Sequence, residues 1–209
     1  MKKLAILLMV LCVLFTGCGF AGETYRNYVK AVLDCTYHEE YQAYQELTKA
    51  SQLASEEIYE TEEAALSQRL RDTYGVRTDM ISEELIQEYT ELAGTILKKT
   101  KYIVRDVIGN GANYTVVLVV SPIDFWEKAQ EDIQEYYDGE FTEKYAKAPT
   151  RTAADRLEEE YASHVLEILT EHAETLAYLE PVIYTFTIEN NGVTSQIWKD
   201  IDELILNLG

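Results

Sequence analysis

The feature that most constrains the fold is a change of hydrophobic period near residue 100. Residues 101–108 (KYIVRDVI) and 114–121 (YTVVLVVS) are rich in β-branched and aromatic side chains, and two glycines lie in the GNGAN segment between them. This pattern predicts a β-hairpin. Because the second run is apolar at odd and even positions alike, it predicts a strand at the centre of its sheet.

Helical periodicity dominates the rest of the chain, in which only three prolines interrupt 209 residues. A second hairpin is predicted over 181–198, with Asn191 and Gly192 in its turn. We expect Ser55 and Ser82 to be N-caps, Gly75 to end a helix, and the helix around Gly139 to be loosened. The predicted helices cover residues 23–36, 41–47, 55–74, 82–97, 125–145, 152–179 and 201–208.

This element order predicts an α+β fold. Two hairpins separated by helices favour a small antiparallel sheet of about four strands, packed against long helices in a helix-rich single domain. A chain of this length buries enough apolar surface to fold without disulfides or metals.

The N-terminal residues have the layout of a secretory signal. Residues 4–15 are apolar, and this run of 12 residues is shorter than the ~20 that a spanning helix needs. Lys2 and Lys3 precede it, and the small residues Thr16 and Gly17 follow. The run therefore predicts a cleaved signal peptide rather than a permanent span.

The FTGC segment at 15–18 resembles the lipobox of bacterial lipoproteins. In that family a diacylglyceryl group is attached to the cysteine thiol, and signal peptidase II cleaves just before the cysteine. The resemblance implies a lipoprotein signal peptide over 1–17, lipidated Cys18, a tether over 18–22 and an extracytoplasmic domain over 23–209. Two acyl chains, such as palmitate, suffice for stable anchoring. Phe15 stands where Leu is commonest, and cleavage by ordinary signal peptidase remains the alternative.

Charge excludes one class of partner. From Cys18 onward, 16 basic residues face 37 acidic ones, a net charge of −21. Such a surface repels nucleic acid, so no nucleic-acid binding is expected. Cys35 is the one cysteine left beside Cys18, which excludes an intramolecular disulfide, and we interpret it as a small apolar residue.

Two longer segments carry a further resemblance. The Tyr-rich YVKAVLDCTYHEEYQAYQELT and the ending VIYTFTIENNGVTSQIWKDIDELI are similar to uncharacterised lipoproteins of Gram-positive bacteria with an extracytoplasmic domain of unknown function. The resemblance implies a lipid-anchored protein on the cell membrane, facing outside. It supplies no catalytic residues.

Few residues point to chemistry, because signatures such as GxSxG and HExxH are missing from the sequence. Glu160, His164, Glu167 and Glu171 share one helical stripe and are candidate ligands of a divalent metal; the alternative is a solvated acidic face. His172 projects with apolar residues and is interpreted as a hydrogen-bonded core histidine. No cofactor is predicted.

A cluster of tyrosines is the candidate binding surface. Tyr37, Tyr41 and Tyr44, if exposed, would stack on a sugar or a peptide, whereas at helical spacing they would equally serve in packing. Arg26 and Lys30 are the cations nearest the anchor and are predicted on the membrane-proximal side.

These observations favour a non-enzymatic binding or accessory module that holds an extracellular protein or small-molecule ligand. The alternative is a metal-assisted hydrolase of the cell envelope that uses the acidic helix face. A solute receptor of a transporter is not expected, because its two-lobed α/β form needs a longer chain with βαβ units.

Overall fold

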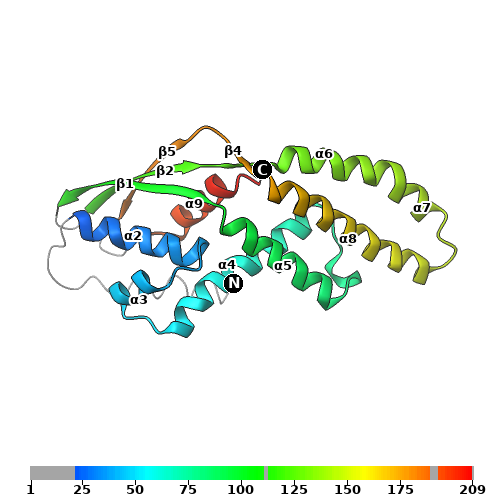
Figure 1. Ribbon diagram of the computed structural model, residues 1–209, viewed down its shortest axis with the longest axis horizontal. Coiled ribbons are helices and arrows are strands. Elements are labelled where there is room, and N and C mark those ends of the chain that lie inside the picture. Colours follow the sequence, from blue (N-terminus) through cyan, green and yellow to red (C-terminus); the bar gives the residue numbers. More distant parts are fainter. Residues whose placement is uncertain (1–21, 111–112, 189–192, 209) are drawn as a thin grey trace. The chain divides into compact units, whose positions relative to one another are not determined.

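The computed structural model describes residues 22–110, 113–188 and 193–208, which form two compact units (Figure 1). One, the sheet unit, contains the described residues up to 60, Lys99–Ile123, and those from 178 onward. The other, the helical unit, contains Thr61–Lys98 and Asp124–Ala177. The predicted signal peptide and Cys18 lie outside the described residues, and the predicted domain boundaries stay a prediction.

A three-stranded antiparallel sheet organises the sheet unit. Its strands are β1 (Lys101–Asn110), β2 (Asn113–Ser121) and β5 (Val182–Ile188), in the order β1-β2-β5. The predicted central position of the second strand is therefore confirmed. Alternate β2 side chains lie on the inner face and are at most 3% exposed: Tyr114, Val116, Leu118 and Val120. Two short strands, β3 (Ile123–Asp124) and β4 (Ala177–Tyr178), form a second sheet.

Helices cover the inner face of the sheet. The helix α2 (Gly22–Tyr37) packs against β1, and α9 (Ser195–Leu206) packs against β2 (Figure 1). A short helix, α3 (Gln42–Thr48), follows α2 after the predicted break near His38. The predicted α+β class with a small antiparallel sheet is thus confirmed.

The second predicted hairpin differs from the structure. Its first strand is β5, which pairs with β2, but residues 195–198 begin α9 instead of a return strand. The Thr194 side chain caps this helix by accepting from the Ile197 N–H at 3.4 Å. The helix places Ile201, Ile205 and Leu206 in the core. This apolar spacing of four overrides the local β-branched composition.

The helical unit consists of α5 (Glu83–Leu97), α6 (Trp126–Tyr136), α7 (Thr142–Ala146), α8 (Arg151–Glu174) and a short 3₁₀ turn, η1 (Thr78–Met80). A π-helical turn, η2 (Tyr137–Phe141), joins α6 to α7, which confirms the predicted loosening at Gly139. The chain passes from the sheet unit to the helical unit within α4 (Gln52–Thr73).

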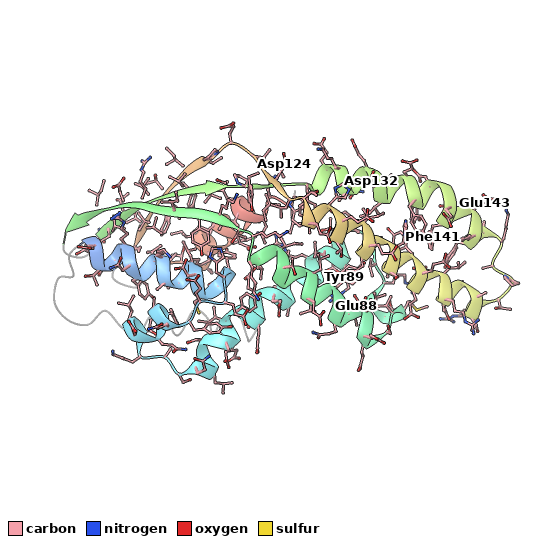
Figure 2. The ribbon with its side chains drawn as sticks, in the orientation of Figure 1. Glu88, Tyr89, Asp124, Asp132, Phe141 and Glu143 are labelled. Atoms are coloured by element: carbon pink, nitrogen blue, oxygen red, sulfur yellow. The ribbon has the colours of Figure 1, made fainter. Side chains whose placement is uncertain are left out.

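Buried tyrosines tie the helical unit together through their hydroxyl groups. Tyr89 of α5 is fully buried and donates to the Ala162 carbonyl at 2.7 Å (Figure 2). Tyr161 of α8 donates to the Tyr74 carbonyl, also at 2.7 Å. Each ring fills the core while its hydroxyl satisfies a backbone acceptor.

Helix ends agree in part with the sequence. Ser82 caps α5 as predicted and accepts from the Leu85 N–H at 3.3 Å. The prediction that Ser55 is the N-cap of α4 was wrong, because the helix begins at Gln52. The Ser51 hydroxyl accepts a hydrogen bond from the Ala54 N–H at 3.2 Å. Ser55 lies inside the helix and is buried. Likewise α8 begins at Arg151, capped by Thr150, and ends at Glu174 rather than near 179.

Gly75 ends α4 in the left-handed conformation, with φ of 68°, as predicted. The Val76 N–H bonds to the Arg71 carbonyl at 2.8 Å, and the Gly75 N–H bonds to Asp72 at 3.3 Å. These two bonds are those of a Schellman motif. No helix within the described ranges is both long and apolar enough to cross a membrane.

Two glycines of the helical unit should respond oppositely to the same substitution. Gly75→Ala should lower the free energy of unfolding by about 1 kcal/mol, because alanine is strained at positive φ. Gly139→Ala should raise it by roughly 0.5 kcal/mol, because an added Cβ meets no atom within 4 Å there and unfolded-state entropy falls. Urea unfolding followed by circular dichroism measures both. Shifts of the same sign would contradict this account of the two backbones.

Candidate functional site

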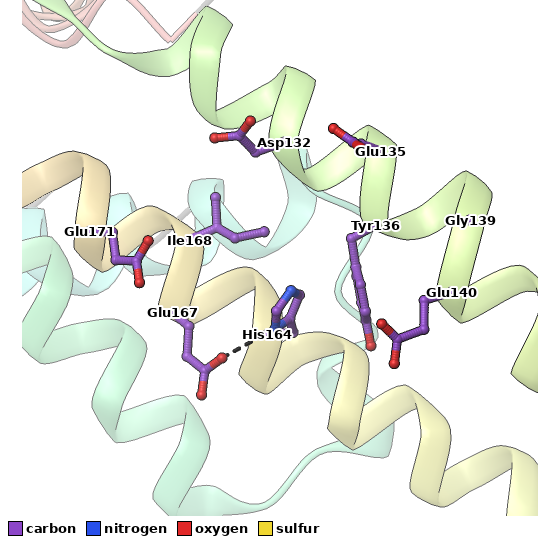
Figure 3. A pocket seen from close by; sticks show the side chains of 9 residues that line it. All are labelled: Asp132, Glu135, Tyr136, Gly139, Glu140, His164, Glu167, Ile168 and Glu171. Atoms are coloured by element: carbon purple, nitrogen blue, oxygen red, sulfur yellow. Dashed lines mark hydrogen bonds and ion pairs between the residues drawn. The ribbon is translucent and has the colours of Figure 1, made fainter.

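An acidic groove in the helical unit is the candidate ligand site. It has a volume of about 580 Å³, within the range of small-molecule sites. The turn η2 and the helix α6 line one side, and α8 lines the other (Figure 3). Five carboxylates and one imidazole face it, from Asp132, Glu135, Glu140, Glu167, Glu171 and His164.

An aromatic pair stands in the groove. The His164 ring packs against the Tyr136 ring, with 4.0 Å between the centroids, and His164 Nδ1 lies 3.1 Å from a Glu167 oxygen (Figure 3). Burial raises the pKa of Tyr136, and the charge of Glu160 adds to the rise while Lys144 opposes it. The phenol therefore stays a neutral hydrogen-bond donor beside the carboxylates.

The four predicted metal ligands do not come together. His164, Glu167 and Glu171 line the groove, but Glu160 bonds to Lys144 at 2.5 Å. Lys144 also pairs with Glu140 at 2.7 Å, and these two contacts raise the pKa of the ammonium group. Over the described part of the chain, no three His, Cys, Asp or Glu side chains are placed to hold one metal ion. The predicted helical stripe is therefore split by an ion pair.

His172 occupies the position that the sequence indicated. Its side chain is 21% exposed, and Nε2 lies 2.7 Å from an Asp132 oxygen. The ring stacks on Phe125 with 6.4 Å between the centroids. It is a half-buried, hydrogen-bonded histidine and does not line the groove.

The tyrosines predicted as a binding surface are largely core residues. Tyr37 and Tyr44 are each 2% exposed, and Tyr41 is half-buried. Burial raises the pKa of Tyr44 to about 12. The structure therefore favours the packing alternative, because side chains this buried offer no face to a sugar or a peptide.

Cys35 is fully buried, which agrees with its interpretation as a small apolar residue. Its Sγ lies 3.6 Å from the Ser55 carbonyl oxygen. Burial, with a smaller contribution from Asp34, raises the thiol pKa to about 12. The protonated thiol is a poor nucleophile at neutral pH.

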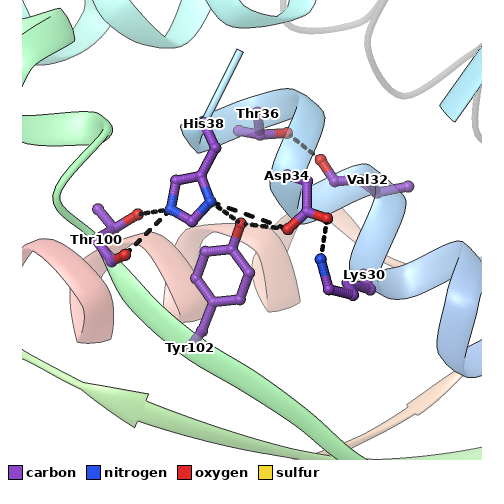
Figure 4. A network of polar contacts seen from close by, with 7 residues as sticks. All are labelled: Lys30, Val32, Asp34, Thr36, His38, Thr100 and Tyr102. Carbon is purple, nitrogen blue, oxygen red and sulfur yellow. Dashed lines mark hydrogen bonds and ion pairs between the residues drawn. The ribbon is translucent and has the colours of Figure 1, made fainter. Parts of the chain in front are cut away.

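A polar network in the sheet unit was missed by sequence reasoning. The Asp34 carboxylate on α2 is 5% exposed and accepts from the Tyr102 hydroxyl at 2.9 Å (Figure 4). Lys30 pairs with its other oxygen. His38 Nε2 lies 3.1 Å from both the carbonyl oxygen and the hydroxyl oxygen of Thr100, and Nδ1 lies 3.2 Å from the Tyr102 hydroxyl. The spacing Lys30, Asp34, His38 along one helical face was the available signal.

This network joins the end of α2 to the start of β1. Burial raises the pKa of Tyr102, and the charge of Asp34 and the hydrogen bond to it add to the rise. The Tyr102 hydroxyl therefore stays protonated and donates a hydrogen bond to the Asp34 carboxylate. A buried carboxylate with an ammonium and a hydroxyl as partners is satisfied and holds the two elements together.

The comparisons with known proteins show a fold. No family model matches the sequence, and no curated protein matches it. The structure is similar to that of ycdA, a candidate lipoprotein from Bacillus subtilis subsp. subtilis str. 168, with a TM-score of 0.55 and 11% sequence identity. The match covers 88% of this chain and 57% of the ycdA chain, so this chain spans little more than half of that protein.

Tyr102→Phe should lower the free energy of unfolding by about 1–3 kcal/mol, because it removes a hydrogen bond from the buried Asp34 carboxylate. Tyr145→Phe, at a side chain 39% exposed, is the control and should change it by less than about 0.5 kcal/mol. Urea unfolding of both variants measures the difference. Equal effects would show that the network contributes no more than an exposed phenol.

Proposed function

We propose that this protein is a lipid-anchored lipoprotein facing outside the cell, and that its folded part is a non-enzymatic binding or accessory module. The observation that carries the proposal is the FTGC segment at the end of a 12-residue apolar run that follows Lys2 and Lys3. Lipidation of Cys18 and removal of residues 1–17 follow from it. The likeness in fold to ycdA, a candidate lipoprotein, supports the same assignment.

The acidic groove supports the binding role. A ligand there would meet carboxylates from both sides and the aromatic pair of Tyr136 and His164, so the chemistry favours a cationic ligand such as a basic peptide or a polyamine. The helical unit carries 23 acidic against 9 basic residues, a net charge of −14, which extends the attraction. No observation specifically favours the metal-assisted hydrolase. One of its four candidate metal ligands, the Glu160 carboxylate, forms an ion pair with Lys144 instead.

Cys18→Ser should abolish incorporation of labelled palmitate in the bacterial host and release the protein from the membrane fraction, because the acyl chains are attached through the thiol. Cys35→Ser, at a buried thiol, is the control and should keep the label. Uptake of label by the Cys18 variant would refute the lipobox interpretation.

The groove can be tested with tetralysine. The double variant Glu167→Gln, Glu171→Gln should bind this peptide several-fold more weakly in calorimetry at low salt, because it removes two carboxylates that line the groove. The matched control is Glu84→Gln, Glu88→Gln, an exposed pair with the same spacing on α5; Figure 2 labels Glu88. Equal weakening in both would assign the attraction to net charge alone.

A further inference from the structure

We infer that the β1–β2 hairpin end of the sheet unit is the surface that faces the lipid bilayer. This surface is defined by Tyr25, Ile108, Gly109 and Asn113. The inference rests on the proposed lipidation of Cys18 and adds to it the orientation of the sheet unit on the membrane. Three observations lead to it: the direction of α2 along β1, the length of the tether, and the chemistry of the hairpin end.

The helix α2 runs along β1 in the opposite direction, and contacts at both of its ends establish this. Near its start, Tyr25 stacks on Tyr114 with 3.9 Å between the ring centroids. Tyr114 pairs with Gly109 next to the end of the hairpin. Near its end, Asp34 and His38 contact Tyr102 and Thr100, where β1 begins. The first turn of α2 therefore lies beside the hairpin end (Figure 1).

A contact in the middle of β1 agrees with this direction. Arg26 Nε donates to the Val104 carbonyl at 3.2 Å, next to the register shift between Val104 and Asp106. Lys30, one turn further along α2, pairs with Asp34. Both cations predicted to face the headgroups thus have partners within the sheet unit. The orientation follows from where α2 begins, not from these two charges.

The tether is too short to separate the hairpin end from the bilayer. Gly22, the first residue of α2, follows Cys18 by four positions, and four residues span at most ~14 Å. A strand rises by about 3.4 Å per residue, so the nine residues of β2 extend over roughly 27 Å. The anchor can therefore reach the hairpin end easily, whereas the opposite end of the sheet lies nearly two tether lengths away.

The chemistry of the hairpin end suits an interface with lipid headgroups. Ile108 is 66% exposed, and Asn113 is exposed and uncharged. In the middle of β1, Arg105 and Asp106 neutralise each other at 3.1 Å. The first turn of α2 contains one acidic residue, Glu23. The other end of α2 is followed by the exposed acids Glu39 and Glu40, which an anionic leaflet repels.

The sheet supplies two matched pairs of positions for a test. Ile103 and Ile108 lie on the same strand and the same outer face, and they are 64% and 66% exposed. They differ mainly in their distance from the hairpin end. Asn113 and Ser121, at the two ends of β2, form a second pair. Cys35 is fully buried, so a nitroxide reagent would label the introduced cysteine selectively.

The experiment uses the lipidated full chain on vesicles of phosphatidylglycerol and phosphatidylethanolamine that contain a nickel-chelating lipid. Nitroxides are attached to Ile108→Cys and Ile103→Cys, and separately to Asn113→Cys and Ser121→Cys. Relaxation by nickel should be several-fold stronger at 108 than at 103, and stronger at 113 than at 121. Circular dichroism checks that each variant is folded.

Equal relaxation within both pairs, or stronger relaxation at 103 and 121, would overturn the inference while the proposed anchoring stands, provided that the protein floats with the vesicles. Failure of the lipid-processed chain to float would overturn both. The Cys18→Ser version of each labelled variant is the control and should show no relaxation by nickel at either position.

Discussion

The pairing of β2 with a partner on each edge is the constraint on which the sheet unit depends. β2 is apolar on both faces, which suits a buried strand. Because its backbone N–H and C=O groups are then cut off from water, they need hydrogen-bonding strands on both edges. Its inner side chains are covered by helices. β1 precedes it directly, but β5 comes from more than sixty residues later. This long-range pairing brings the C-terminal segment back to the sheet, where α9 then covers β2. The sheet unit is therefore built from three separate stretches of the chain.

The direction of α2 follows from the sheet and from one buried carboxylate. Burying Asp34 is costly unless its oxygens are satisfied, and the partners that satisfy it stand on α2 itself and at the start of β1. At the other end of the helix, two stacked tyrosine rings hold its first turn beside the hairpin. A helix fixed in this way would leave little freedom to the proposed lipid tether, which would couple anchoring to the fold.

Charge explains why a groove exists in the helical unit. The helices α6 and α8 contact each other, and on their buried sides Ala129, Ile133, Val165 and Leu169 are at most 2% exposed. On the faces of the same turns that line the groove, both helices present carboxylates, which repel one another and keep their water. These side chains therefore do not pack into a closed interface. Lys144 neutralises two acids, Glu140 and Glu160. The same acidity underlies the expectation that nucleic acid does not bind and the proposed preference of the groove for a cation.

The sequence by itself determined the class of the fold, the first hairpin, the central place of β2 and the ends of several helices. These features depend on local period and capping: Ser82 and Gly75 act within one turn of their own helix. Only the tertiary structure decided the rest. Residues 195–198 form the first turn of α9, which Thr194 caps, instead of the predicted return strand. Glu160 pairs with Lys144, sixteen residues earlier in the chain, and so does not line the groove with the other predicted metal ligands. The Asp34 network and the burial of Tyr37 depend likewise on β1, since a local pattern cannot specify which distant side chain will satisfy or cover a given residue.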